Sequence, residues 1–330
     1  MKIIVDAFGG DNAPLEIIKG SAMAVEEYNL DIVLVGSKEI IEKVAAENNI
    51  SLKRMEIIDV QQVITMEDAP TDVIKSKKNC TMAEGFKLVA SGYGDAFVSA
   101  GNSGAMVVGA TMYVKRIKGV KRCAFAPVIP NSNGCFMLID SGANVDCRPE
   151  MLTQFGIMGS IYMNKVMNIN NPRVGLANVG TEEHKGGELQ QEAFLQLKES
   201  NLNFVGNLEA RDIPLDGAEV VVADGFTGNI ILKMYEGVAV MLLGMFKGAL
   251  TQNLKAKIAA SMILPEMRQL KKKIDYNEYG GAPIIGISKP VFKAHGNSKA
   301  LTFKNAIRLA SEYVNKDVVG EITKAFAKDK

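Results

Sequence analysis

The sequence lacks several features by which particular classes of protein are recognised. Its 330 residues include no tryptophan, two histidines and four cysteines, and 38 Lys and Arg nearly balance 37 Asp and Glu, which leaves a formal net charge of +1. This small charge argues against a protein that its overall field holds on nucleic acid, although a local basic patch is compatible with it. Apolar and charged fractions of 47% and 23% are ordinary, so disorder, collagen and disulfide scaffolds are not expected.

Metal-binding cysteine pairs and long hydrophobic runs are also missing. Cys80, Cys123, Cys135 and Cys147 form no CxxC pair, so buried structural thiols are expected and no metal site is. The N-terminal apolar run stops at Asp6, too early for a signal peptide. The longest strongly apolar stretch, 238–246, is far shorter than the ~20 residues that cross a bilayer. These absences predict a cytosolic protein with reduced thiols.

What the sequence does contain is an alternation of short β-branched runs with amphipathic stretches. Strands are expected at 2–5, 31–36, 55–60, 96–99, 124–128, 136–140, 174–177, 203–206 and 220–223, and helices at 14–28, 38–48, 81–91, 102–116, 150–166, 186–198 and 299–314. This order is typical of an α/β protein with a mostly parallel sheet covered on both faces. No internal repeat or long linker is present, so residues 1–330 are expected to form one intertwined unit.

Ligands of open parallel sheets bind beyond the carboxyl ends of the strands, where four glycine-containing turns follow predicted strands. The first turn contains Asp6, Gly9, Gly10 and Asp11, and its glycines would let a ligand approach the backbone. A tight turn in which Asp11 or Asn12 caps the next helix is the favoured alternative for these glycines.

The second turn carries Asn102, Ser103 and Gly104 at the start of a predicted helix. Helix N-termini bind phosphate, and the turn lacks both the Walker lysine pattern and GxGxxG. A small phosphate is therefore favoured over a nucleotide, and plain helix capping is an equal alternative.

A third turn, Asp224-Gly225-Phe226-Thr227-Gly228-Asn229, closes the run 220–223. A carboxylate, a hydroxyl and an amide within six residues at the end of a buried strand favour function over a simple helix cap at Asp224. We therefore take Asp224 and Asn229 as catalytic candidates and Gly225, Thr227 and Gly228 as substrate-binding candidates.

Two cations remain as candidates. Lys185 follows the predicted strand 174–177 and would bind phosphate or stabilise an oxyanion, whereas the neighbouring His184 is expected to be a surface residue. His295 precedes the last predicted helix and is equally compatible with acid–base chemistry and with a role in starting that helix. No GxSxG elbow is present, so covalent catalysis is not the leading hypothesis.

The segment 238–273 is basic and amphipathic, although the net charge of the whole chain is close to zero. Apolar residues recur every four positions from Leu242 through Leu254, Ile258 and Met262, which predicts a helical stripe that Pro265 ends. The cations around the stripe include Lys257, Arg268, Lys271, Lys272 and Lys273. Core or dimer packing is the favoured interpretation, and contact with an anionic membrane or an acidic protein partner is the alternative.

Taken together, the segments VDAFGGDNAP, SAGNSGA, NVGTEEHKGGE, ADGFTGN and KAHGNS resemble the bacterial phosphate acyltransferase family, in order from Lys2 to about Ser298. The resemblance implies a three-layer α/β/α fold related to isopropylmalate dehydrogenases and phosphotransacetylases, and Lys185, Asp224 and Asn229 as active-site residues. It also implies a homodimer, peripheral association with the inner face of the cell membrane, and a downstream glycerol-phosphate acyltransferase as a possible partner. Phe8 departs from the Met that the family often has.

The activity implied by this resemblance is transfer of a long acyl chain from acyl-acyl carrier protein to inorganic phosphate, for phospholipid synthesis. Phosphate would attack the thioester directly, because a thiolate is a reasonable leaving group with a reference pKa of about 8.5. No cofactor is required. The rivals are a nicotinamide-dependent dehydrogenase of the related fold, although its expected carboxylate cluster and Arg-rich site do not emerge, and a non-enzymatic membrane scaffold.

Overall fold

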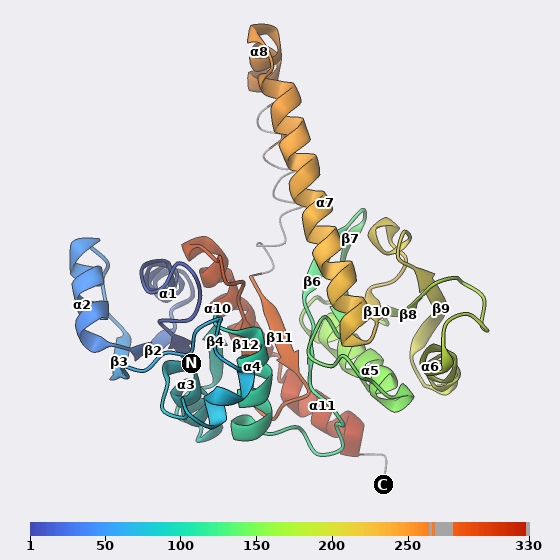
Figure 1. Ribbon diagram of the computed structural model, residues 1–330, viewed down its shortest axis with the longest axis horizontal. Helices are drawn as coiled ribbons and strands as arrows, with labels where there is room; N and C mark the ends of the chain where they lie inside the picture. The colour runs from blue at the N-terminus through green and yellow to red at the C-terminus, as the bar shows by residue number, and fades with distance from the viewer. Residues whose placement is uncertain (264–265, 268–279, 328–330) are drawn as a thin grey trace.

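The computed structural model describes residues 1–263, 266–267 and 280–327, and these residues contain two β-sheets that lie side by side (Figure 1). The first sheet has the strand order β3-β2-β1-β4-β12-β11-β5, and the second has the order β6-β7-β10-β8-β9. Neighbouring strands are parallel except in the pairs β11–β12, β11–β5 and β6–β7. The bounds are β1 Lys2–Asp6, β2 Asp31–Gly36, β3 Met55–Asp59, β4 Ala96–Ser99, β5 Ala124–Phe125, β6 Val128–Asn131, β7 Gly134–Ile139, β8 Arg173–Asn178, β9 Asn203–Glu209, β10 Val220–Val222, β11 Ala282–Ile285 and β12 Val291–Lys293. The expected mostly parallel α/β architecture is therefore confirmed.

Helices cover both faces of the first sheet. Successive side chains of a strand point to opposite faces, and in β1 the side chains on both faces are apolar and need cover. Ile3 and Val5 of β1 pack in one cluster with α1 (Leu15–Tyr28) and α10 (Ala300–Asn315). Ile4, between them, packs in a second cluster with α3 (Thr81–Ala90) and α4 (Ser103–Gly109). A strand that is buried on both faces reads as a continuous apolar run, which is why the run at the N-terminus was recognisable in the sequence. α2 (Lys38–Glu47) contacts β3 and α1 at the edge of this half.

The second sheet is covered in the same way. Met137 and Ile139 of β7 face α5 (Pro149–Lys165), and α6 (Glu188–Glu199) packs beside α5. Phe136 and Leu138 face the other side, where Leu232 of α7 (Gly225–Thr251) packs against them. The first turns of α7 are thereby fixed to the sheet, and this placement brings the polar residues of those turns to the sheet edge.

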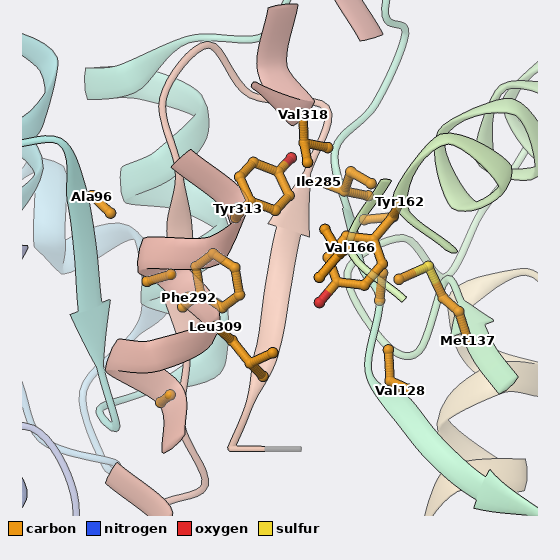
Figure 2. Packing of buried hydrophobic residues seen from close by; sticks show 14 of the residues in the cluster. Ala96, Val128, Met137, Tyr162, Val166, Ile285, Phe292, Leu309, Tyr313 and Val318 are labelled. Carbon is orange, nitrogen blue, oxygen red and sulfur yellow. The ribbon is translucent and has the colours of Figure 1, made fainter. Parts of the chain in front are cut away.

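One apolar cluster reaches both sheets. Figure 2 shows Tyr313 of α10 and Phe292 of β12 on one side, and Tyr162 of α5 on the other. The ring centroids of Tyr162 and Tyr313 lie 5.9 Å apart, and those of Phe292 and Tyr313 lie 5.4 Å apart. α11 (Val318–Ala327) also contacts α5. That residues 1–330 fold as one intertwined unit stays a prediction, and this shared cluster is the feature in its favour.

Two local expectations are wrong. The predicted strand 124–128 is two strands, β5 in the first sheet and β6 in the second, with Pro127 between them. Proline has no N–H to give to a sheet ladder, which explains why the pairing breaks there. Asn12 and Asp11 do not cap α1, because Pro14 occupies the N-cap position. The Asn12 amide instead donates to the carbonyl oxygen of Asn297 at 3.0 Å.

The remaining short elements are irregular turns. The predicted helix 102–116 is α4 followed by a π-helical turn, Ala110–Val114. Two 3-10 turns, Pro70–Ile74 and Ile213–Leu215, lie in connections. The connection that contains Pro70 packs on α4.

α7 leaves the body of the molecule and projects far from it, with α8 (Leu254–Met262) at its tip (Figure 1). The predicted stripe is interrupted at 252–253, between the two helices. Leu254, Ile258 and Met262 are 74%, 56% and 77% exposed. The stripe is therefore not part of this chain's own core, which corrects the core interpretation and leaves an interface with a second copy, a membrane or another partner.

By length and composition alone, Gly225–Thr251 is a helix that is able to cross a membrane, although its apolar stretch 238–246 is shorter than such a span. Its first turns, however, pack on the second sheet, where the Tyr235 hydroxyl donates to the carbonyl oxygen of Pro130. The part that projects, 238–251, is about 21 Å long at 1.5 Å per residue, whereas the bilayer core is about 30 Å thick. With the body folded as described, this part is too short to span.

Candidate active site

A cleft of about 210 Å³ lies between the two halves, beyond the carboxyl ends of β7 and β12 and beside α7. Its wall combines apolar side chains with several hydrogen-bond donors and one carboxylate. The polar lining side chains are Ser103, Ser141, Asn229, Lys233, Tyr235, Glu236, Lys293 and His295. The position agrees with the expectation that the ligand site lies at the carboxyl ends of parallel strands.

Lys293 and His295 come from the end of β12. The Lys293 ammonium donates to the carbonyl oxygens of Ala100, at 3.2 Å, and Ala294. Burial lowers the pKa of Lys293 to about 8, against the raising effect of Asp11. Burial also lowers the pKa of His295, while Glu236 opposes that shift. Burial therefore favours the neutral form of both groups, in a cleft that holds several donors for an anion.

α7 contributes Asn229, Lys233 and Glu236, which are spaced four and three residues apart and so share one helix face. The Lys233 ammonium donates to Oε2 of Glu236 at 2.9 Å. The other carboxylate oxygen, Oε1, lies 3.8 Å from Nε2 of His295. This contact joins α7 of one half to the strand end of the other across the cleft.

The start of α7 is held by the residues of the third turn. Asp224 accepts hydrogen bonds from the Thr227 N–H at 2.9 Å and from the Thr227 hydroxyl at 2.8 Å, so it is the helix cap. A Cβ on Gly225 would lie 2.5 Å from the Asn144 carbonyl oxygen, and one on Gly228 would lie 1.9 Å from that of Asp140. None of the turn residues Asp224, Gly225, Thr227 and Gly228 lines the cleft. Their contacts fix the helix that carries Asn229, which does.

The turn after β1, which contains Asp6, Gly9, Gly10 and Asp11, packs against the elements that carry the cleft residues. Asp6 is buried and accepts a hydrogen bond from the Ser99 hydroxyl at 2.8 Å, and burial raises the pKa of Asp6. Gly10 has φ of +102°, and the Asp11 N–H donates to the Gly296 carbonyl oxygen at 2.8 Å. A Cβ on Gly9 would lie 2.7 Å from the Asp6 carboxylate. The turn thus joins the loop after His295, and none of these four residues lines the cleft.

In the turn at the start of α4, Asn102 and Gly104 make structural contacts, whereas Ser103 faces the cleft. Asn102 caps α4 by accepting the Ala105 N–H at 3.0 Å, and its amide nitrogen points at the carbonyl oxygens of Thr65, Met66 and Asp68. Gly104 packs against Pro70. Ser103 lines the cleft. Helix capping therefore occupies Asn102, and Ser103 is the residue of this turn that a ligand meets.

Lys185 lies on the loop between β8 and α6, and β8 is the neighbour of β10 in the second sheet. Its ammonium is 3.8 Å from a Glu182 carboxylate oxygen, and its side chain is 41% exposed. It does not line the cleft, and a catalytic role for it stays a prediction. His184, as expected, is a surface residue.

The tip residues are exposed as an interaction surface requires. Leu254, Lys257, Ile258 and Met262 are all exposed on α8. The other predicted contact residues, Arg268, Lys271, Lys272 and Lys273, lie outside the described residues. A role of the tip toward carrier protein or membrane stays a prediction.

Sequence reasoning did not select Lys233, Glu236 and Lys293. The signal for the first two was the spacing: Asn229, Lys233 and Glu236 place three polar residues on one face of an otherwise apolar helix. Lys293 was visible only as the first residue of the KAHGNS segment. Its location in the cleft depends on the pairing of β12 with β4, in which paired residues are 194 positions apart in the chain, and single-sequence reasoning does not give that pairing.

Neither a metal nor a nucleophilic thiol stands out. Among residues 1–263, 266–267 and 280–327, no group of three or more His, Cys, Asp or Glu side chains is arranged to hold a metal ion. Cys80 and Cys123 are buried, and burial raises the pKa of each thiol. Burial also raises the pKa of Cys147 to about 12. A thiolate nucleophile is disfavoured at these positions.

The fold is that of a group that includes phosphotransacylases and dehydrogenases. The structure superposes on a phosphotransacetylase from Streptococcus pyogenes with a TM-score of 0.64 and 17% identity, covering 96% of this chain and 94% of that one. A 4-hydroxythreonine-4-phosphate dehydrogenase from Burkholderia phymatum gives 0.51 and 13%, covering 94% and 97%. At these identities the likeness shows the fold alone.

Sequence comparison gives the family within this fold. A family profile described as "Fatty acid synthesis protein" matches residues 1–321. A phosphate acyltransferase from Caldanaerobacter subterraneus subsp. tengcongensis is 47% identical over 323 residues, covering 98% of this chain and 96% of that relative. The chain belongs to this fatty acid synthesis protein family and is a phosphate acyltransferase, as the sequence resemblance implied.

Proposed function

We propose that this enzyme transfers a long acyl chain from acyl-acyl carrier protein to inorganic phosphate, releasing acyl phosphate and free carrier protein. The observation that carries the proposal is the cleft, where donors for an anion lie beside an apolar wall. The apolar side chains of that wall are Phe125, Pro127, Val128, Ile129, Leu232, Ala239, Ala282 and Ala294. An acyl thioester and a phosphate together present this combination of surfaces.

The donors support binding of phosphate. Lys293 and Lys233 supply positive charge, and Asn229 and Ser103 supply hydrogen bonds, so all four favour an oxyanion in the cleft. Phosphate held in this place attacks the thioester carbon, the C–O bond forms, and the C–S bond breaks with its electron pair on sulfur. The proton of the phosphate ends on the thiolate. Asn229, which lines the cleft, stabilises the oxyanion that develops on the carbonyl, which is where catalytic donors contribute most. Lys185 does not line the cleft, and its assignment as a second donor rests on the sequence resemblance alone.

The exposed tip supports the partners of this reaction. Leu254, Ile258 and Met262 form an apolar surface with Lys257 beside it, and such a surface suits an anionic membrane. The acidic carrier protein docks on a basic face of a homodimer, and the product passes to a glycerol-phosphate acyltransferase at the inner face of the cell membrane. These partners belong to the proposal and rest on the resemblance and on the exposure of the tip.

The decisive experiment incubates the purified protein with acyl-acyl carrier protein and phosphate and follows loss of the thioester. We expect loss that depends on phosphate and is about 10²-fold slower in kcat/KM for Asn229→Ala, because one oxyanion donor is removed. Lys185→Ala tests the second proposed donor. Lys43→Ala, on the exposed side of α2, is the matched control and should keep full activity.

The outcomes test the acyltransfer reaction and the assignment of the site residues separately. No phosphate-dependent loss of thioester by folded wild type rejects the acyltransfer reaction with this substrate. Full turnover by both Asn229→Ala and Lys185→Ala, with an active wild type, rejects the site assignment alone. Consumption of a nicotinamide cofactor with a hydroxy acid would favour the dehydrogenase rival instead.

A further inference from the structure

Glu236 carries a buried acceptor that has no donor. Its side chain is 18% exposed, and its Oε2 accepts the Lys233 ammonium at 2.9 Å. Oε1 is buried and has no hydrogen-bond partner among the described residues. Nε2 of His295 lies 3.8 Å from Oε1, which is beyond hydrogen-bond distance. Buried polar atoms are nearly always satisfied, so an orphan acceptor at the wall of a cleft points to a ligand that donates.

The other polar groups of the cleft restrict that ligand. Lys233, Lys293, Asn229 and Ser103 all present donors, and together they favour an oxyanion. A carboxylate oxygen among these donors repels an oxyanion that has no proton. It accepts a hydrogen bond from an oxyanion that has one. Inorganic phosphate and arsenate carry a proton near neutral pH, and sulfate does not.

We propose that Glu236 is the residue that selects a protonated oxyanion, by accepting the O–H of hydrogen phosphate at Oε1 and rejecting sulfate at the same place. The inference rests on the proposed function in that phosphate is the bound substrate. Lys233 holds the carboxylate in position from the other oxygen. Selection of this kind is strong, because the wrong anion leaves the acceptor unpaired and places two negative charges in contact.

The test measures binding of phosphate, arsenate and sulfate to the full-length protein by titration calorimetry. We expect wild type to bind phosphate and arsenate at least about 10²-fold more tightly than sulfate. Glu236→Gln keeps the shape and replaces the carboxylate by an amide that also donates, so it should bind sulfate better and reduce the ratio at least tenfold. The control Glu192→Gln makes the same charge change on the exposed face of α6 and should keep the wild-type ratio.

The inference is overturned if wild type binds sulfate as tightly as phosphate, or if folded Glu236→Gln keeps the wild-type ratio. A ratio that falls in Glu192→Gln as well also overturns it, since the effect would then be one of overall charge. Because the readout is binding, its failure is distinct from that of the proposed function. Thioester loss in wild type with an unchanged ratio in Glu236→Gln rejects the selection alone, whereas absent thioester loss with a reduced ratio rejects the reaction alone.

Discussion

Lys293 is the cation that cleft burial affects most clearly. The pKa of its ammonium is lowered to about 8 because burial disfavours the charged form. The group is therefore cationic below about pH 8 and neutral above it. The ammonium donates two hydrogen bonds to backbone carbonyl oxygens, which leaves one N–H for a ligand in the cleft.

The first prediction is a rise of the KM for phosphate as pH passes through about 8. One pH unit above the pKa only about one Lys293 in ten keeps its charge, so we expect KM to rise about tenfold between pH ~7 and ~9. Arginine stays charged throughout this range. Lys293→Arg should therefore flatten the profile, whatever its absolute KM, and a wild-type KM that is constant over this range would contradict the role of Lys293.

Single residues show what the sequence can and cannot predict. Asp224 and Asn102 were recognisable as helix caps or ligands, because Asp and Asn before a helix serve both roles, and the structure shows the caps. The contact of Glu236 with His295 joins positions 59 residues apart in different elements. A single sequence contains no signal for such a contact, so the polar cluster of the cleft was predicted only in part.

At the scale of elements, the site depends on how closely α7 approaches the loop after β7. The buried Asp140 carboxylate accepts the N–H groups of Phe125, Gly142, Ala143 and Asn144, which fixes this loop. Gly228 packs on the backbone of this loop and leaves no room for a side chain. Asn229, the next residue, then lies beside Gly142 in the cleft.

The second prediction is that Gly228→Ala damages both stability and activity. The added Cβ would lie 1.9 Å from the Asp140 carbonyl oxygen, so α7 or the loop must move. We expect a loss of about 1–3 kcal/mol in the free energy of unfolding, measured with urea. A displaced Asn229 should also lower kcat/KM about 10²-fold.

Gly237→Ala is the matched control on the same helix. Nothing lies within 4 Å of a Cβ at Gly237, so alanine should stabilise the helix by about 0.5–1 kcal/mol and leave activity unchanged. Equal stability and activity of Gly228→Ala and wild type would show that the close approach is not needed.

Elements were predicted better than their arrangement. β1, β2, β4, β7 and β10 were expected near their observed bounds, because buried parallel strands read as short β-branched runs. The division of 124–128 between two sheets was not expected, since five apolar residues in a row contain the same signal whether they pair with one sheet or two. β11 and β12 were both missed.

At the scale of the whole molecule, α7 connects the cleft to an exposed tip. The near-zero net charge gave no hint of this, because the cations of 238–273 are balanced by acidic residues elsewhere in the chain. In the folded chain Lys257 lies beside apolar residues that have no cover from the described residues of the same chain. An apolar surface with cations beside it is able to bind an anionic membrane, and the same surface is able to pack on a second copy.

The last prediction separates these two uses of the tip. Leu254→Glu and Ile258→Glu each place a negative charge on its apolar face, where the native side chains are 74% and 56% exposed. If the tip inserts into lipid, the fraction of protein that sediments with anionic phosphatidylglycerol vesicles should fall at least about fivefold, because each variant loses buried apolar area and gains repulsion. Leu215→Glu makes the same change at a 69% exposed leucine on the body and should sediment like wild type. Unchanged sedimentation of folded tip variants, together with a loss of the dimer in analytical ultracentrifugation, would instead assign the tip to contact between copies of the chain.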